Sequence, residues 1–409
     1  MSASIFIRGP KLLAQLHNGS LGNYIDLVAT RFIDERFSRT YVITGLTTIG
    51  VFGQWLDRSG FAVRDIDERL IDRFLCDGSI PVRFYARGAL RKLLTILRER
   101  GDAPPAPVVV GPNAELERDF EQHLVTERGL ATRTVEHYLE AAQTFLAVIA
   151  KNQAFDSHTL TPADILRFVR RTAISRAPAS MQQLCTGLRA FLRYLQLCGL
   201  VTTDLARVLP RIAHWRLATL PKFLTRDQVQ QVLASCNRND AIGGRDYAVL
   251  MLLARLGLRA NEIAALRLDD IDWRLGQLTV RNKGRGPEPM PLPQDVGEAL
   301  AAYLHDGRPV TSSRAVFVRH MAPHTALMDS RAVISIVVRI MRRTGINAPS
   351  KGAHIFRHTL ATQMLREGAS LAEIGRVLRH RDEDTTRIYA KVDLTRLRTL
   401  AMRWPGGVP

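Results

Sequence analysis

The chain has 409 residues, of which 46% are hydrophobic and 23% are charged. This length exceeds what one ordinary hydrophobic core organises, so we expect two or three globular domains. The longest apolar run, Tyr247–Ala254, is far shorter than the roughly 20 residues that span a bilayer. Charged residues near the N-terminus also interrupt any signal-peptide pattern, so we expect neither membrane insertion nor secretion.

The charge balance gives the first indication of a partner. Lysine and arginine outnumber aspartate and glutamate by 57 to 39, a formal net charge of +18. Such an excess destabilises a compact chain by self-repulsion unless a polyanion is the usual partner, which predicts binding to nucleic acid. A general arginine bias of the source genome would give the same excess, so charge alone leaves the chemistry open.

The cysteines indicate the redox environment. Cys76, Cys185, Cys198 and Cys236 are scattered without close pairing. This argues against a zinc module and a disulfide framework, and fits a reducing cytoplasm. We expect all four to be small core residues.

Two stretches mark domain boundaries. Prolines and glycines cannot sustain a helix through Gly101–Pro112, and two prolines bracket a short basic stretch within Leu209–Pro221. We therefore predict an N-terminal helical domain at 1–105, a middle helical domain at 113–212 and a third domain at 218–409.

Helical periodicity characterises the middle domain. Apolar residues recur at helical spacing through Thr132–Ile149, and Thr161 precedes Pro162 as an N-cap would. A third apolar stripe fills Ser180–Cys198, and Gly199 follows it as a C-terminal glycine should.

The first domain repeats features of the middle one. Arg39, Ile71 and Phe74 have counterparts 94 residues further on, and Leu90 and Gly101 have counterparts 98 residues further on. One short loop insertion would explain the drift, so we hypothesise a duplicated small helical domain. Chance similarity between two amphipathic helical stretches is the open alternative.

The first half of the third domain predicts mixed structure. Arg245–Leu256 is a strongly apolar helix, and Asn261–Leu268 continues helically after a break at Gly257. Leu278–Arg281 alternates as a strand, and Met290–Leu292 can pair back on it across a glycine-rich turn.

The second half of this domain predicts further helices. They are expected at Ser330–Arg343 and from His354 to Glu367. A capping box of Ser370 and Glu373 begins another helix, and Asp384 caps a short one that carries Tyr389.

Four local signals in the third domain carry chemistry. They are Arg259 after an apolar helix, Lys283 at the tip of the predicted hairpin, the cluster H-I-F-R-H with His354, Arg357 and His358, and His380 followed nine residues later by Tyr389.

These residue types suit attack on a phosphodiester. Its non-bridging oxygens gain negative charge as phosphorus becomes five-coordinate, and Arg259 and Arg357 can supply bidentate donors there. His354 lies three residues before Arg357, so on a helix both side chains face the same way. Tyr389 is the candidate nucleophile; its phenol, with a reference pKa of about 10, needs local positive charge or a base. Lys283 could deliver a proton to the departing deoxyribose oxygen.

Each of these residues alone also fits an ordinary surface or core role. Their order and spacing in one domain carry the hypothesis, and here the sequence resembles a known family. The segments P-K-F-L-T-R-D-Q-V, L-A-R-L-G-L-R-A-N-E, H-I-F-R-H-T-L-A-T-Q-M-L and V-L-R-H-x-x-x-x-T-T-R-I-Y resemble the catalytic domain of tyrosine site-specific recombinases, the phage integrase family, over about 190 residues from Pro221 onward. The middle domain is similar, more loosely, to that family's core-binding domain.

The resemblance implies a fold class and roles for part of the site. We expect a multi-domain protein, with all-α N-terminal and core-binding domains and a mixed α+β, mainly helical, tyrosine recombinase catalytic domain. Arg259 and Arg357 would hold the scissile phosphate, and Lys283 would protonate the leaving 5′ oxygen. Glu262 would either hold Arg259 by a salt bridge or be a plain solvated position.

The remaining roles follow from the same resemblance. His354 would accept or donate a proton, His380 would support the phosphate and orient the site, and Tyr389 would form the 3′-phosphotyrosyl bond. The chain departs from the family at Arg379, where the family usually has glycine. This departure leaves the local turn open. We predict no cofactor and no metal.

Further basic residues are predicted to contact DNA. They are Arg211, His214, Trp215 and Arg216 in the linker before the third domain, and Arg281 and Arg285 beside Lys283. The expected partner is double-stranded DNA with a specific recombination site, bound by a homotetramer or by a mixture with sister recombinases. We expect this assembly in a prokaryotic cytoplasm, associated with the nucleoid.

Two other functions stay open from the sequence. A related type IB topoisomerase would relax any supercoiled DNA without exchanging partners. A catalytically silent DNA-binding protein would occupy recombination sites without cutting, although the complete set of six residues argues against it.

Overall fold

The structure is a computed structural model that describes residues 3–7, 9–77, 85–106, 111–151, 153–212, 221–281, 286–327, 329–348, 350, 352–380 and 384–392. The chain divides into two compact units, one of Met1–Ala106 together with Thr219–Pro409 and one of Pro107–Ala218. Across the described residues, no helix combines the length and the apolar character needed to cross a membrane. The predicted division into three domains stays a prediction.

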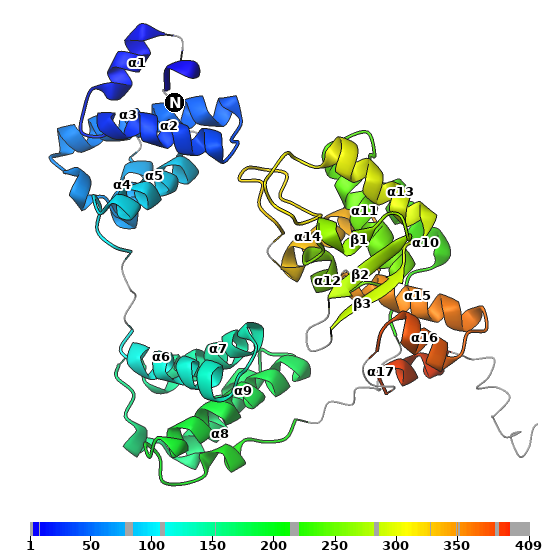
Figure 1. The fold of residues 1–409 in the computed structure, drawn as a ribbon. Helices are drawn as coiled ribbons and strands as arrows, with labels where there is room; N and C mark the ends of the chain where they lie inside the picture. The colour runs from blue at the N-terminus through cyan, green and yellow to red at the C-terminus, as the bar shows by residue number, and fades with distance from the viewer. Residues whose placement is uncertain are drawn as a thin grey trace, which may run out of the picture. The chain divides into compact units, whose positions relative to one another are not determined.

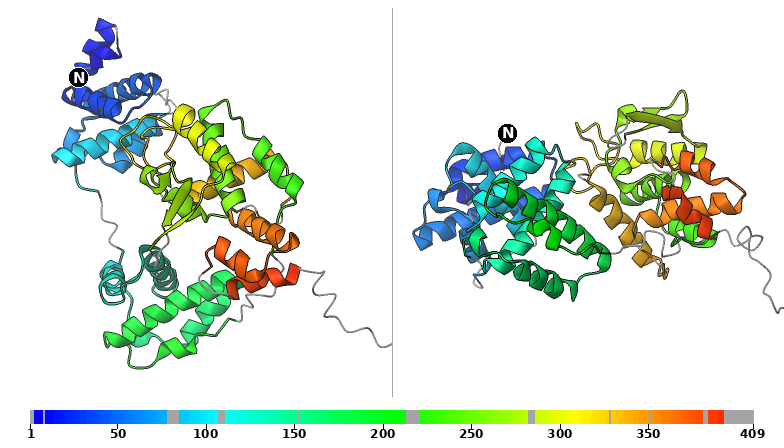
Figure 2. Two further views of the ribbon diagram at one scale, coloured as in Figure 1. Left: turned by 45° about the vertical axis from the view of Figure 1, so that its right-hand side comes forward. Right: turned by 90° about the horizontal axis from the view of Figure 1, so that it is seen from below.

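The N-terminal part of the chain is all-helical and has its own hydrophobic cluster. Its helices are α1 (Pro10–His17), α2 (Ile25–Asp34), α3 (Arg39–Ser59), α4 (Glu68–Leu75) and α5 (Ala86–Arg100). The middle part is also all-helical around a separate cluster. Its helices are α6 (Ala114–Gln122), α7 (Thr132–Ile149), α8 (Pro162–Ala173) and α9 (Pro178–Leu197). Figure 1 labels these helices, and Figure 2 shows them from two further sides.

Local sequence signals explain the middle helices. The predicted bounds Thr132–Ile149 of α7 are confirmed. Thr161 is the N-cap of α8 and accepts a hydrogen bond from the backbone N–H of Asp164, as its position before Pro162 predicts. Gly199 follows α9 in the left-handed conformation with φ of 71°, which glycine adopts without steric cost.

The two helical parts share internal geometry. In the first, α3 packs on α5 and the Phe52 and Phe74 ring centroids lie 4.9 Å apart. In the second, α7 packs on α9 and the Phe145 and Phe168 centroids lie 5.1 Å apart. Each aromatic pair joins a long helix to the short helix that follows it in the chain.

The ends of α5 and α9 are also alike. Gly101 follows α5 with φ of 79°, as Gly199 follows α9. The next backbone N–H donates back over the helix end in both parts, from Asp102 to the Leu97 carbonyl and from Leu200 to the Leu195 carbonyl, each at 2.9 Å. Both glycines thus end their helices by the same turn.

The C-terminal part is mixed. Its helices are α10 (Arg226–Ala234), α11 (Ala241–Leu256), α12 (Ala260–Ala264), α13 (Gln294–Ala302), α14 (Ser330–Arg343), α15 (His354–Arg366), α16 (Leu371–Val377) and α17 (Asp384–Arg387), and a 3₁₀ segment η9 (Ile388–Val392) follows. Its strands are β1 (Ile271–Asp272), β2 (Gln277–Arg281) and β3 (Pro287–Pro291), in the antiparallel order β1-β2-β3.

The predicted hairpin is confirmed. Leu278 pairs with Met290, and Leu292, just beyond the end of β3, donates its N–H to the Gly276 carbonyl at 2.8 Å. Leu278 and Val280 are buried, as alternation on a one-sided sheet requires. In β3 every second residue, from Pro287 to Pro291, is proline, and proline lacks the N–H of a central strand. β3 accordingly lies at the edge of the sheet.

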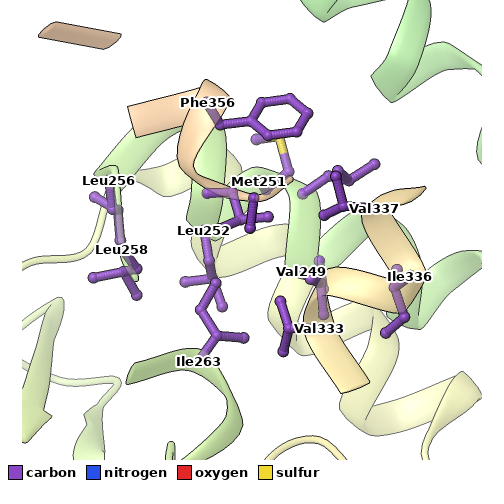
Figure 3. Packing of buried hydrophobic residues seen from close by; sticks show 14 of the residues in the cluster. Val249, Met251, Leu252, Leu256, Leu258, Ile263, Val333, Ile336, Val337 and Phe356 are labelled. Carbon is purple, nitrogen blue, oxygen red and sulfur yellow. The ribbon is translucent and has the colours of Figure 1, made fainter. Parts of the chain in front are cut away.

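The core of this part surrounds α11. Six consecutive residues of that helix, Ala248–Leu253, are buried, so the helix is covered on every side. Figure 3 shows Val249, Met251 and Leu252 facing residues of α12, α14 and α15, among them Ile263, Val333, Val337 and Phe356. α12 is shorter than the predicted helical stretch Asn261–Leu268, because it ends at Ala264.

Gly257 ends α11 at the junction with α12. Its φ is 59°, and a Cβ atom there would lie 2.8 Å from Leu378 Cδ2 and 3.0 Å from Leu360 Cδ2. Both the conformation and the close approach therefore require glycine. The residue after α16 packs on this junction, which brings the chain at 378–380 beside the beginning of α12.

The cysteine expectation is half wrong. Cys185 and Cys236 are buried, but Cys76 and Cys198 are exposed. Cys76 directly follows α4 and Cys198 directly follows α9, and helix ends lie at the surface here.

Candidate active site

Arg259 is held at the first turn of α12 by Glu262. It occupies the N-cap position; its backbone N–H donates to Glu262 Oε2 at 2.8 Å and its guanidinium donates to Oε1 at 2.8 Å. The carboxylate side chain is 4% exposed whereas the arginine side chain is 36% exposed. The predicted salt bridge is confirmed, and the alternative of a solvated Glu262 is wrong.

Arg379 shares the same carboxylate. Its guanidinium donates to Glu262 Oε2 at 2.7 Å and contacts Met290 Sδ of β3 at 3.2 Å, and its side chain is 3% exposed. Its φ of 52° is left-handed, a conformation that costs a non-glycine residue roughly 1 kcal/mol or more. The departure from the family pattern at Arg379 left this turn open. In the structure, the buried ion pair between Arg379 and Glu262 offsets the strain of the left-handed backbone. Two guanidinium groups on one carboxylate leave one net positive charge.

Arg357 is fixed by backbone carbonyls. It lies on α15 and is 3% exposed, and its guanidinium donates to the Gly257 carbonyl at 2.6 Å and to the Leu378 carbonyl. Burial, followed by the nearby Arg259 charge, lowers its pKa to about 10, so it stays cationic at neutral pH. Guanidinium has five N–H donors, so further donors exist for an anion.

Three histidines surround these cations. His354 and His358 lie one helical turn apart on α15 with ring centroids 6.1 Å apart, and His380 follows α16. Burial is the first cause that lowers the pKa of each: it lowers the pKa of His358 and of His380 to about 4. Positive charge on Arg357 acts in the same direction on all three. All three imidazoles are therefore neutral at pH 7.

Tyr389 lies on η9 against two of these histidines. Its side chain is 1% exposed, and burial raises the pKa of its phenol to about 12, with Arg357 opposing the rise. The hydroxyl shares a hydrogen bond of 2.9 Å with His358 Nδ1. Its ring lies parallel to that of His380, at a centroid distance of 6.4 Å and an angle of 7°. The sequence predicted that Tyr389 lies on a short helix beginning at Asp384. That helix, α17, ends at Arg387, so Tyr389 lies on the 3₁₀ segment η9 that follows it.

His380 has its own support. Its Nδ1 lies 2.6 Å from Thr386 Oγ1 of α17, and its backbone N–H donates to the Gly375 carbonyl of α16 at 2.9 Å. A Cβ on Gly375 would lie 3.2 Å from Thr386 Oγ1, so the absence of a side chain there allows the close approach of α17. Contacts join α15, α16 and α17, which lie next to one another in Figure 1.

The structure brings five of the six predicted catalytic residues together. Charge interactions link Arg259 to His354 and His380, and link Arg357 to Tyr389. Lys283 lies outside the described residues. The catalytic roles of all six stay predictions.

The predicted DNA-contacting residues are only partly described. His214, Trp215, Arg216 and Arg285 lie outside the described residues, and Arg211 is exposed. Arg281 donates through Nε and Nη2 to Asp270 Oδ1 at 2.9 and 2.7 Å, yet its side chain is 56% exposed. Arg281 therefore stabilises the start of the sheet and still presents part of its guanidinium to solvent.

The sequence reasoning missed three residues of this site. His358 was part of the H-I-F-R-H cluster but received no role, although its position four residues after His354 puts both on one helix face. Arg379 was recorded only as a departure from the family. Thr386 stands in the quoted T-T-R-I-Y motif but received no role. In the described part of the chain, no group of three or more histidine, cysteine and acidic side chains is arranged to hold a metal ion.

The mainly helical domain with a small antiparallel sheet, in which arginines act on histidines and a tyrosine, fits the class of enzymes that break and rejoin DNA strands. Residues 222–396 match the Phage integrase family. The chain is 39% identical to the "Putative integrase/recombinase y4rA" of Sinorhizobium fredii over 98% of both chains. It is 29% identical to the tyrosine recombinase XerD of Listeria monocytogenes, over 69% of this chain and 96% of that protein.

Solved structures show the same fold. The XerH site-specific recombinase bound to its palindromic difH substrate in a post-cleavage complex aligns with a TM-score of 0.55 and 18% identity, over 69% of this chain and 83% of that chain. A lambda integrase dimer bound to a COC′ core site aligns with a TM-score of 0.53 and 14% identity, over 67% of this chain and 94% of that chain. The chain thus belongs to the phage integrase family of tyrosine recombinases, and it is a site-specific DNA recombinase.

Proposed function

We propose that the chain cleaves and religates DNA through a covalent 3′-phosphotyrosyl bond to Tyr389, without metal or ATP. The observation that carries this proposal is the position of the Tyr389 phenol beside the buried Arg357 guanidinium and in hydrogen-bond contact with His358. A nucleophile, a fixed cation and a neutral imidazole lie within one cluster of side chains.

The cations suit the charge that develops in the reaction. Attack of the phenolic oxygen on phosphorus makes the phosphate five-coordinate and increases the negative charge on its non-bridging oxygens. Arg357 and Arg259 would donate to these oxygens, because each keeps N–H groups beyond those used by its protein partners. The phosphotyrosyl bond keeps the free energy of the phosphodiester, so no ATP is required for rejoining.

The other predicted roles complete the proposed cycle. His354 would accept or donate a proton, His380 would support the phosphate, and Lys283 would protonate the leaving 5′ oxygen. Arg211, His214, Trp215 and Arg216 would contact DNA along the linker, and Arg281 and Arg285 would do so on the hairpin. The substrate would be duplex DNA with a specific site, bound by a homotetramer or with sister recombinases, in association with the nucleoid.

We propose in addition that the N-terminal helical part is a duplicate of the middle, core-binding part. The shared helix order, the two aromatic pairs and the equivalent turns at Gly101 and Gly199 support this. Superposition of the two parts in a crystal structure would test it: helices that fail to match in order would exclude a duplication.

The alternatives differ in what they do to DNA. A topoisomerase-like activity predicts relaxation of any supercoiled plasmid, whereas a recombinase requires its own paired sites. A silent DNA-binding protein predicts site occupancy with no covalent adduct.

The decisive experiment is recovery and sequencing of DNA covalently attached to the protein in cells. The proposal predicts adducts at one defined sequence, lost in Tyr389→Phe. Adducts spread over all sequences would favour relaxation. An adduct that persists in Tyr389→Phe, or no adduct with the wild-type chain, would exclude the proposed mechanism.

A further inference from the structure

His358 contacts the oxygen that the proposed function makes the nucleophile. Its Nδ1 lies 2.9 Å from the Tyr389 hydroxyl, in a partly buried contact between residues 31 apart in the chain. The six residues of the proposed mechanism do not include it. A histidine in this position raises the question of where the phenolic proton goes.

The other two histidines are less suited to receive that proton. The Nδ1 of His380 lies 2.6 Å from Thr386 Oγ1, and its ring faces the ring of Tyr389 instead of its hydroxyl. His354 neighbours His358, not the Tyr389 hydroxyl, and the centroids of the two imidazole rings are 6.1 Å apart. Among the described residues, the hydrogen bond to the Tyr389 hydroxyl comes from His358.

We propose that His358 is a catalytic residue that accepts the phenolic proton of Tyr389. This inference rests on the proposed function. As the bond between Tyr389 Oη and phosphorus forms, the Oη proton moves to Nδ1 of His358. The bond from phosphorus to the 5′ oxygen breaks, and that oxygen keeps the electron pair and takes a proton from Lys283. In rejoining, the 5′ hydroxyl attacks phosphorus and returns its proton to Lys283, and the His358 imidazolium returns the other proton to Oη as the phosphotyrosyl bond breaks.

Without DNA, burial, His354 and Arg357 lower the pKa of His358 to about 4, so bound substrate must raise this pKa for the role. The groups that face His358 are His354 and Arg357 on its own helix, Tyr389 on η9 and His380 after α16. Its imidazole is neutral without DNA, and Nδ1 is an acceptor when Nε2 carries the hydrogen. A phosphodiester held by Arg357 would offset the positive charge of the Arg357 guanidinium. Substrate binding would therefore raise the pKa of His358 and favour the imidazolium that proton transfer creates.

His358 also stays close to the reacting atoms. The Tyr389 side chain is 1% exposed, so binding of DNA must open a path to its hydroxyl. The charge of Arg357 acts on both His358 and Tyr389, and two backbone carbonyls fix the Arg357 guanidinium. A phosphate held by Arg357 and a phenol that reaches it would therefore both lie beside His358.

Two substitutions test proton transfer against simple positioning. His358→Asn places a side-chain oxygen near the site of Nδ1, so it can accept a hydrogen bond but does not take the proton at neutral pH. His358→Ala removes both abilities. The substrate is a nicked duplex that carries the site recovered by sequencing, and the readout is the rate of covalent adduct formation from pH 6 to 9.

We expect both variants to form adduct about 10²-fold to 10³-fold more slowly at pH 7. Their rates should rise about tenfold per pH unit, because hydroxide then removes the proton, and added imidazole should partly restore His358→Ala. A 5′-bridging phosphorothioate, whose sulfur leaves without a proton, should restore Lys283→Ala but neither His358 variant.

Other outcomes would overturn the inference. Wild-type rates in His358→Asn would reduce His358 to a positioning residue. Slow cleavage with an unchanged pH profile and no response to imidazole would show that His358 does not take the proton, and faster cleavage would mean that the hydrogen bond restrains Tyr389. Failure of the proposed function itself is seen separately, as absence of any adduct with the wild-type chain.

Discussion

The two sides of the candidate site are built differently. On the phosphate side, Arg259, Arg357 and Arg379 donate to a buried carboxylate and to backbone carbonyls. On the nucleophile side, Tyr389 lies on the 3₁₀ segment η9 and His380 follows α16. In the described part of the chain, a neutral hydrogen bond to a side chain holds each of them, from His358 and from Thr386 of the short helix α17.

This difference indicates what each side has to do. Hydrogen bonds with an ionised partner are roughly twice as strong as neutral ones, so the phosphate side is organised before DNA arrives. A neutral hydrogen bond contributes only about 1 kcal/mol net, so the nucleophile side can rearrange at small cost. Substitutions on the first side should reduce both stability and cleavage, and those on the second side mainly cleavage.

Arg357→Ala should have the largest effect. It removes a fixed cation from the phosphate, which we expect to slow adduct formation about 10³-fold. It also leaves the Gly257 and Leu378 carbonyls without their donor, which should lower the free energy of unfolding by about 2 kcal/mol. Urea unfolding and adduct assays measure the two effects. The exposed Arg376→Ala is the control, and equal behaviour of the two variants would contradict a special role for Arg357.

Glu262→Gln should have the second largest effect. It leaves the buried Arg379 without a counter-charge, and breaking a buried ion pair typically costs about 3 kcal/mol or more. Arg259 loses its fixed orientation, which we expect to slow cleavage about 10²-fold. Urea unfolding and the adduct assay again give both numbers. The matched control is Glu298→Gln at an exposed position of α13, and a stable, fully active Glu262→Gln would show that the two sides do not differ as argued.

The third largest effect should come from acid, which should lower the free energy of unfolding through the histidines of the nucleophile side. The pKa values of His358 and His380 are about 4 in the folded chain, against about 6.5 when unfolded. Between these values the unfolded chain binds more protons, so the contribution of these histidines to the free energy of unfolding is constant above pH 6.5 and falls below it. Each histidine contributes up to roughly 1.4 kcal/mol per pH unit in that window. Urea unfolding from pH 7.5 to 4.5 should show a shallower fall in a His358→Asn, His380→Asn double variant; an equal fall would contradict the shifts.

Thr386→Val should have the smallest effect. Valine has nearly the same shape but removes the hydroxyl that contacts His380 Nδ1, a loss of about 1 kcal/mol. Because the phosphate side is untouched, DNA affinity should stay unchanged while adduct formation slows roughly three- to tenfold. The exposed neighbour Thr385→Val is the control. A loss of DNA affinity in Thr386→Val would mean that the two sides are coupled.

Local signals in the sequence predict much of the fold. The predicted bounds of α14, Ser330–Arg343, are confirmed, and Ser370 and Glu373 form the predicted capping box of α16. These features depend on residues within a few positions of one another, which periodicity and capping rules describe.

The contacts that complete the site were not predictable in this way. Arg379 and Glu262 are 117 residues apart, and their ion pair depends on how α16 packs against the junction of α11 and α12. The hydrogen bond between His358 and Tyr389 depends on where η9 lies against α15. Family resemblance identified the candidate residues, but only tertiary structure shows which of them share a partner.

The carbonyl of Gly257 has a consequence for how this site tolerates change. Gly257 lies two residues before Arg259 and accepts a hydrogen bond from Arg357, so the main chain links the two arginines, while Glu262 orients the Arg259 guanidinium. Side chains other than Glu262 can therefore vary around these contacts without altering the width available to a phosphate. Evolution of new target sequences would then require changes only in surfaces that read bases, while the chemistry is inherited intact.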